Sequence, residues 1–133
     1  MLIGHGVDLV QIPRIGAIYE KYQSQFVNRI LTLDEKSKYN RLNKKQKITY
    51  LATRFAGKEA FAKALGVGIG QIAFKDIGIV NRANGKPEIH LSHNVSSIIQ
   101  SLLNRQDMRF HISLTNTDEN AMASVIIELV KDH

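Results

Sequence analysis

The sequence contains no cysteine, so neither a disulfide framework nor a thiolate site is possible. It also lacks tryptophan and shows no alternation of basic and aromatic residues of the kind that forms a base-stacking platform. No apolar run approaches the roughly 20 residues that a membrane helix needs. The start, MLIGHGVDLV, lacks the basic region and long apolar core of a signal peptide. These absences predict a cytoplasmic protein.

No repeat, low-complexity tract or linker rich in Pro, Gly or Ser divides the chain of 133 residues. This length suits one compact domain with a sizeable core and is too short for two ordinary ones. We therefore expect residues 1–133 to form a single domain.

Lys and Arg outnumber Asp and Glu by 18 to 12, which gives a net charge of +6. A positive surface field favours an anionic partner. The sign does not choose among a nucleic acid, an acidic protein and a phosphorylated small molecule. A small basic nucleic-acid-binding domain is therefore one hypothesis, and it predicts basic residues spread over one face.

Residues 2–10 have the alternation of a strand. Its odd positions are mostly apolar, and its even positions carry glycines and a carboxylate: Ile3, Val7 and Leu9 against Gly4, Gly6 and Asp8. The second face is therefore bare backbone that ends in an acid. Pro13 suits a first helical turn, so we expect a helix from residue 13 to the mid-twenties.

Two capping-box patterns predict the next helices. Thr32 and Glu35 have the spacing that opens a short helix. Asn43 caps a long helix expected over about 44–65, which Gly66 ends.

The second half of the chain is predicted to consist mainly of strands. Alternation and strand-like composition place them over residues 73–80, 87–91, 109–115 and 121–130. Asn84 and Gly85 form a dipeptide favoured in tight hairpin turns, because both residues accept positive φ. Ser92 caps a helix over 93–103. The expected fold class is α+β, with a mainly antiparallel sheet packed against one long helix and shorter helices.

The stretch RFAGKEAFAKALG, residues 54–66, places Glu59 among apolar side chains of the long helix. Helical geometry surrounds it with Leu51, Ala52, Phe55, Ala56 and Ala62. A buried carboxylate without a partner costs several kcal/mol or protonates. Lys63, one turn farther on, is the simplest partner, so a Glu59–Lys63 salt bridge is one interpretation. The small alanines also leave room for another group to approach the helix.

Asp8 alone reads as an end-of-strand residue or a helix cap. If the glycine-bare face of its strand packs opposite Glu59, two carboxylates converge without bulk between them. Such a pair suits a hard divalent cation such as Mg²⁺, which usually takes one or two protein carboxylates and completes its shell with waters and phosphates. With Arg54, Lys58 and Lys63 nearby, we expect a site for a polyphosphate.

Four segments together resemble one known family. They are GVDLVQIPRI, RFAGKEAFAKALG, the GKP of residues 85–87 and HISLTNT. They occur in the order and spacing of the holo-acyl-carrier-protein synthases, a branch of the 4'-phosphopantetheinyl transferases. The resemblance covers essentially the whole chain. Its specific part is the Gly-x-Asp strand combined with the Phe-x-x-Lys-Glu-Ala helix, since GKP alone occurs in many hairpins.

This resemblance implies transfer of 4'-phosphopantetheine from coenzyme A to a serine of apo acyl carrier protein, with release of adenosine 3',5'-bisphosphate. It implies that Asp8 and Glu59 hold Mg²⁺, which neutralises charge on the phosphoryl oxygens. Lys63 would hold a phosphate or orient Glu59, and the alanines would give clearance to coenzyme A. The implied coenzyme A contacts are Arg54, Lys63, Gly85, Lys86, Pro87 and Thr115.

The resemblance also gives the basic helix a partner. Arg14 matches a family arginine that docks acidic carrier proteins, and Lys21, two turns farther, shares its face. The alternative for both is a solvated charged face. The family further implies a homotrimer with active sites between neighbouring subunits. An inactive relative that only binds carrier protein is a third hypothesis.

The chain departs from the family in its last motif. The family commonly has Ser-x-Ser-His, whereas residues 113–116 read Ser-Leu-Thr-Asn. Asn116 cannot take a proton at neutral pH. The acceptor serine's proton would then pass to Glu59, Asp8 or a metal-bound water, and we favour a water polarised by Mg²⁺ and hydrogen-bonded to Glu59.

Two other features carry weaker signals. His90 and His93 have a spacing that metal ligands can have, but no acid cluster is expected beside them. The GVGIG of residues 66–70 lacks the lysine-serine ending of a phosphate-binding P-loop, so we interpret it as the turn after the long helix.

Overall fold

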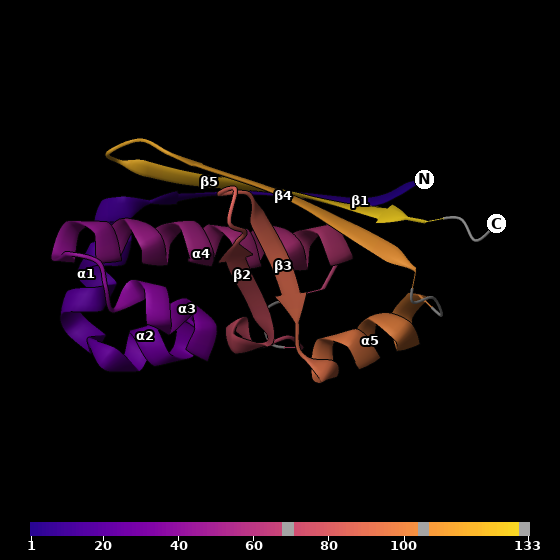
Figure 1. Ribbon diagram of the computed structural model, residues 1–133, viewed down its shortest axis with the longest axis horizontal. Coiled ribbons are helices and arrows are strands. Elements are labelled where there is room, and N and C mark those ends of the chain that lie inside the picture. Colours follow the sequence, from indigo (N-terminus) through magenta and orange to yellow (C-terminus); the bar gives the residue numbers. More distant parts are fainter. Residues whose placement is uncertain (68–70, 104–106, 131–133) are drawn as a thin grey trace.

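The computed structural model describes residues 1–67, 71–103 and 107–130 of the chain (Figure 1). Its helices are α1 (Ile12–Tyr22), α2 (Ser24–Ile30), α3 (Leu33–Tyr39), α4 (Lys44–Leu65) and α5 (His93–Leu103). Its strands are β1 (Leu2–Gln11), β2 (Ile77–Asn81), β3 (Pro87–Leu91), β4 (Met108–Asn116) and β5 (Asn120–Leu129), and a 3-10 turn, η1, covers Phe74–Asp76. The α+β prediction is confirmed.

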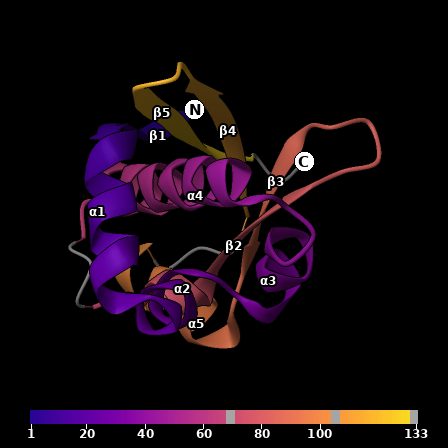
Figure 2. The ribbon, with the colours of Figure 1, turned by 90° about the vertical axis from the view of Figure 1, so that its left-hand side faces the viewer.

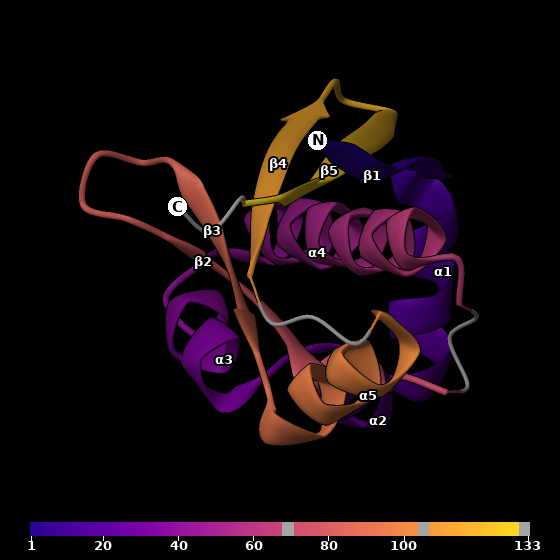
Figure 3. The ribbon, with the colours of Figure 1, turned by 90° about the vertical axis from the view of Figure 1, so that its right-hand side faces the viewer.

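The strands form two antiparallel sheets around the long helix. One sheet has the order β1-β5-β4, and the other is the β2-β3 hairpin. Figure 1 shows α4 lying along one face of the three-stranded sheet, with α2, α3 and α5 beyond it on the same side, and Figure 2 shows α1 running from the level of β1 past the end of α4. The loop of the β2-β3 hairpin projects from the body of the molecule (Figures 2 and 3). The three-stranded sheet thus has one helix-covered face and one outer face.

The glycines of β1 allow this strand to lie directly on α4. A Cβ atom at Gly6 would lie 2.0 Å from the carbonyl oxygen of Ala60, and one at Gly4 would lie 2.1 Å from that of Ala64. Both alanines are buried. The space beside these alanines is therefore filled by the backbone of β1. The alanines expected to give clearance to coenzyme A are also buried, so that interpretation is wrong: Ala52, Ala56 and Ala62.

The central strand β5 covers α4 with small and branched side chains. The side chains that face inward are buried: Ala121, Ala123, Val125 and Ile127. Asp8 pairs with Ala123 in the sheet register, which fixes the height of its carboxylate along the helix. In the described part of the chain, no helix is both long and apolar enough to cross a membrane.

The predicted helix signals are confirmed by hydrogen bonds. Backbone N–H groups of Thr32 and Glu35 donate to each other's side chains at 2.8 and 3.2 Å, and Asn43 caps α4 in the same way. Gly66 ends α4 with a φ of 77°. Two boundaries differ. The N-terminal helix breaks at Gln23, whose φ is 51°, so that α2 can turn its apolar side chains inward.

The second boundary difference lies at the expected strand 73–80. Its first residues form η1, whose start is held by the Asp76 carboxylate accepting from the Ala73 N–H at 3.3 Å. In the hairpin loop, Gly85 has a φ of 86°, but Asn84 does not adopt positive φ. The Asn84 side chain instead accepts a bond from the Lys86 N–H at 3.0 Å. The GVGIG turn lies partly outside the described residues.

Candidate functional site

Asp8 and Lys63 meet where β1 crosses α4. The Lys63 ammonium donates to Asp8 Oδ1 at 2.9 Å and to the carbonyl oxygen of Val7 at 3.1 Å. The Asp8 side chain is only 14% exposed, whereas that of Lys63 is 55% exposed. Glu59 lies one turn before Lys63 on α4, and helical geometry places it on the same side. The predicted approach of the glycine-bare strand face to α4 is confirmed.

Glu59 is a half-buried carboxylate without a direct partner. Among the described residues, none donates a hydrogen bond to it or forms an ion pair with it, since Lys63 pairs with Asp8 instead. The predicted Glu59–Lys63 salt bridge is therefore wrong. Burial raises the pKa of Glu59, and the negative charge of Asp8 raises it further, while the charge of Lys63 partly lowers it.

This pair of acids fits the oxygen ligands that Mg²⁺ prefers. Asp8 and Glu59 supply carboxylate oxygens, and burial, together with the charge of Asp8, raises the pKa of Glu59. Residues 1–67, 71–103 and 107–130 contain no group of three or more His, Cys, Asp or Glu placed to hold a metal. The protein thus offers two carboxylates and leaves the remaining positions to water and phosphate, as Mg²⁺ sites do. The His90 ring pairs with Glu88 at 3.0 Å on the hairpin.

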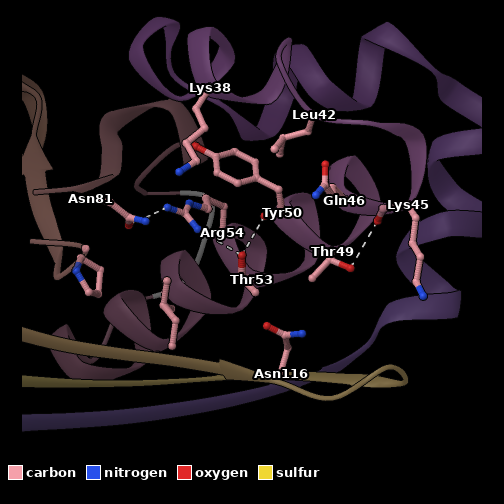
Figure 4. Close-up of a pocket in the computed structure, with 13 residues that line it drawn as sticks. Lys38, Leu42, Lys45, Gln46, Thr49, Tyr50, Thr53, Arg54, Asn81 and Asn116 are labelled. Atoms are coloured by element: carbon pink, nitrogen blue, oxygen red, sulfur yellow. Dashed lines mark hydrogen bonds between the residues drawn. The ribbon is translucent and has the colours of Figure 1, made fainter. Parts of the chain in front are cut away.

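A separate pocket surrounds Arg54, between α3, α4, β4 and the hairpin (Figure 4). Its volume is about 450 Å³, and its polar lining includes Lys38, Lys45, Gln46, Thr49, Asn81 and Asn116. Arg54 itself is 6% exposed. Its guanidinium stacks 4.1 Å from the centroid of the Tyr50 ring and donates to Asn81 Oδ1 at 3.1 Å and to Thr53 Oγ1 at 3.3 Å.

The Arg54 guanidinium is only partly satisfied. Its Nε is buried and lacks a hydrogen-bond partner within the described residues. Burial lowers the pKa of Arg54, and interaction with Tyr50 and Glu35 partly opposes this. A buried cation with a free donor, next to two lysines of the pocket lining, is suited to bind an anionic group.

The remaining predicted contacts are divided between surfaces. Gly85 and Pro87 line the Arg54 pocket, and so does Asn116, the residue at which the last motif departs from the family. Lys86 lines a different cavity, of about 510 Å³, beside the outer edge of β4. Thr115 alternates with Asn116 along β4 and is exposed. One chain therefore does not gather all the predicted coenzyme A contacts in one pocket.

Lys58 belongs to the fold and not to the site. Its side chain is fully buried, and its ammonium lies 2.6 Å from Glu35 Oε1 and 2.5 Å from the carbonyl oxygen of Ile30. Glu35 Oε2 in turn accepts from the Ile79 N–H at 2.9 Å. These bonds join α2, α3, α4 and β2. The expectation that Lys58 contributes to a polyphosphate site is wrong, because its charge cannot reach a ligand.

A third cavity contains Glu59 itself. It has a volume of about 650 Å³ and a mostly apolar lining: Ile18, Tyr22, Gln25, Phe26, Arg29, Ile30, Phe55 and Phe74 besides Glu59. We call this cavity the Glu59 groove. Arg14 and Lys21 are exposed on α1, and Ile18 lies between them in helical spacing. The two predicted docking cations therefore lie within about one helical turn of Ile18, which lines the Glu59 groove.

Sequence reasoning placed Phe55 beside Glu59 but identified neither the other groove aromatics, Tyr22, Phe26 and Phe74, nor the partners of Arg54. Tyr50 precedes Arg54 by four residues on α4, a spacing that places an aromatic ring beside a cation and could have marked the contact. Asn81 comes from the hairpin, and its approach to Arg54 depends on tertiary packing.

Residues 4–122 match the family model of the 4'-phosphopantetheinyl transferase superfamily. This chain belongs to that superfamily. It is also 43% identical, over 97% of its length and 100% of the relative's, to a holo-[acyl-carrier-protein] synthase of Staphylococcus saprophyticus. The family resemblance found in the sequence is confirmed, and the hypothesis of a nucleic-acid-binding domain finds no support.

Solved structures of the family have the same fold. The chain is similar to the holo-[acyl-carrier-protein] synthase of Neisseria meningitidis, with a TM-score of 0.86 and 36% identity over 96% of this chain and 99% of that one. It is also similar to the Bacillus anthracis synthase in complex with coenzyme A (3',5'-ADP), with a TM-score of 0.81 and 31% identity over 98% and 99% of the two chains.

Proposed function

We propose that this chain is a Mg²⁺-dependent holo-acyl-carrier-protein synthase. It transfers 4'-phosphopantetheine from coenzyme A to a serine hydroxyl of apo acyl carrier protein, releases adenosine 3',5'-bisphosphate, and thereby supports fatty acid biosynthesis in the cytoplasm. The observation that carries the proposal is the meeting of Asp8, Glu59 and Lys63 in a chain of this family.

The acidic cluster suits phosphoryl transfer to an alcohol. The serine oxygen forms a bond to the β-phosphorus of coenzyme A, and the bond from that phosphorus to the bridging oxygen of the leaving group breaks. Asp8 and Glu59 would hold Mg²⁺, which supplies charge neutralisation at the pyrophosphate. Lys63 would add its positive charge to the same phosphates.

The serine proton needs an acceptor, and Asn116 lines the Arg54 pocket and not the Glu59 groove. Glu59 is the group of the chain suited to this role. It lines the groove, and none of the described residues forms a hydrogen bond or an ion pair with its carboxylate. We propose that Glu59 receives the proton through a water molecule.

The Arg54 pocket would bind a phosphate group of coenzyme A. Arg54 offers a buried donor without a partner, and Lys38 and Lys45 add charge at the pocket. This pocket and the Glu59 groove share none of their lining residues. A coenzyme A molecule that uses both would therefore lie between two chains, with Glu59 from one and Arg54 from the other.

The outer face of the three-stranded sheet would bring such chains together. A solvated face would carry polar side chains, but this one exposes four apolar side chains from adjacent strands: Ile3, Val7, Leu9 and Met122. Their exposed fractions run from 36% to 65%. A contiguous apolar patch of this kind marks an interface. We propose that this face forms the homotrimer that the family resemblance implies.

The acidic carrier protein would dock on α1. Arg14 and Lys21 give positive charge within about one helical turn of Ile18, which lines the Glu59 groove, and the aromatic residues of the groove provide apolar contact. These charges would steer association, while the groove would position the acceptor serine near Glu59.

The direct test is incubation of the protein with apo acyl carrier protein, coenzyme A and Mg²⁺, followed by mass spectrometry of the carrier. We expect a mass increase of one phosphopantetheinyl group, which disappears when coenzyme A is omitted or Mg²⁺ is chelated. A carrier that stays unmodified at every enzyme concentration would contradict the enzyme proposal. It would leave the inactive carrier-binding protein as the alternative.

A further inference from the structure

Lys63 holds Asp8 at the position where the proposed function requires a metal. Its ammonium spans Asp8 Oδ1 at 2.9 Å and the Val7 carbonyl oxygen at 3.1 Å, so it already satisfies two oxygens at the end of the glycine face. The Asp8 side chain is 14% exposed, so its carboxylate is largely enclosed. A cation that binds Asp8 and Glu59 must therefore share this space with the ammonium.

We infer that Lys63 is an internal competitor of the divalent cation, which occupies Asp8 in the metal-free protein and must release it when the metal binds. This inference rests on the proposed metal site at Asp8 and Glu59. It concerns the affinity of that site and not the chemistry of transfer.

Two physical effects favour release. A divalent cation at Asp8 would lie within a few ångströms of a like-charged ammonium, and this repulsion is strong in a partly buried place. The oxygen that accepts from Lys63, Asp8 Oδ1, is also fully available to the metal only when the ion pair breaks. Lys63 can leave at low cost, since its side chain is 55% exposed and its flexible stem can move the charge into water.

The metal affinity of the free protein is therefore lower than that of the same two carboxylates without the lysine. Lys63→Gln removes the competing charge and leaves a side chain that cannot pair with Asp8 as an ion. Lys63→Arg keeps the positive charge and the ability to pair. Lys44→Gln is a matched control: Lys44 also forms an exposed ion pair, at 2.8 Å to Glu20, and its loss changes the net charge equally.

The experiment measures Mn²⁺ binding to the full chain without coenzyme A, by electron paramagnetic resonance of free Mn²⁺. We expect Lys63→Gln to lower the Kd for Mn²⁺ about threefold or more, the size expected for loss of a partly exposed ion pair and its repulsion. Lys63→Arg and Lys44→Gln should bind within twofold of the wild type, and the Lys63→Gln gain should shrink as salt is raised. Circular dichroism melting confirms that each variant is folded.

The outcomes separate the inference from the function on which it rests. Wild-type binding that Asp8→Asn abolishes, together with no gain in Lys63→Gln, would overturn the competition and keep the metal site. An equal gain in Lys44→Gln would also overturn it, because net charge alone would then explain the effect. If the wild type does not bind Mn²⁺, or if Asp8→Asn binds it as tightly as the wild type, both the competition and the proposed metal site are overturned.

Discussion

Glu59 is a residue whose ionised side chain lowers the stability of the folded protein. It is half-buried among apolar side chains, faces the charge of Asp8 and has no direct partner in the described part of the chain. A carboxyl whose pKa is raised on folding is less stable ionised in the folded state than in the unfolded chain. Its ionised form therefore costs stability, a pattern typical of residues kept for function.

Glu59→Gln should abolish transfer and leave the protein folded, because the amide keeps the shape and loses the charge. The stability effect has a defined sign. Below the pKa of the unfolded carboxyl both states are protonated and carry no penalty, and the penalty appears as pH rises through the raised folded pKa of Glu59. The variant should therefore melt at or above the wild-type temperature at pH 7 and match it below about pH 4.

Thermal melts at both pH values, together with the carrier mass assay, check this prediction. A variant that unfolds at pH 7 would show that Glu59 is needed for the fold and would remove the argument for a functional carboxylate. Retained turnover would show that another group holds the metal and receives the proton.

At the scale of elements, the approach of β1 to α4 builds the site. Gly6→Ala would place its Cβ 2.0 Å from the Ala60 carbonyl oxygen, a backbone atom that cannot move aside alone. The strand must then lift from the helix and carry Asp8 away from Lys63. We expect a loss of about 2 kcal/mol or more in the free energy of unfolding, as for overpacked cores, and a large loss of transfer.

Gly16→Ala is the matched control, since its Cβ would have an ordinary contact at 3.5 Å with Ile48 and alanine suits the interior of α1. It should stabilise the protein by up to about 1 kcal/mol. Urea unfolding measures both variants. If Gly6→Ala is as stable as the wild type, the close packing of β1 on α4 does not position Asp8.

The elements that could be predicted from the sequence are those that depend on local interactions. The capping boxes at Thr32 and Asn43 and the stop at Gly66 involve neighbours within a turn or two, so their patterns are sufficient. The break at Gln23 has no such pattern, because it arises from packing of α2. Lys58 was misplaced for the same reason: its partner Glu35 is 23 residues away, and only the tertiary fold joins them.

At the scale of the whole molecule, the sequence predicted the approach of the Asp8 strand to the Glu59 helix better than the position of Arg54. Asp8 and Glu59 could be paired because a glycine-bare strand and an alanine-rich helix fit each other. The expectation that Arg54 joins them failed within one chain, since helical rotation turns Arg54 toward the β2-β3 hairpin. Periodicity within a chain carries no information about a neighbouring chain, and assembly therefore remains a proposal.

Active sites shared between subunits make a prediction that a single-chain site cannot satisfy. Glu59→Gln and Arg54→Gln should each abolish transfer. When both variants are co-expressed with different tags, mixed trimers contain one interface with an intact Glu59 from one chain and an intact Arg54 from the next. Random mixing of equal amounts should recover about a quarter of wild-type turnover, because about three quarters of the trimers are mixed and each has one working site of three.

Purification through both tags isolates the mixed trimers, for which we expect about a third of wild-type turnover because each has one working site of three. Analytical ultracentrifugation checks their size, and the carrier mass assay measures their turnover. Leu9→Arg, on the exposed apolar face, should abolish both the assembly and the recovery. Mixed trimers that are no more active than either parent would place Glu59 and Arg54 in separate functions. Recovery can occur only if one chain supplies the acids and its neighbour supplies the basic pocket. The same measurement, with and without Leu9→Arg, therefore tests both the shared active site and the apolar sheet face as the interface.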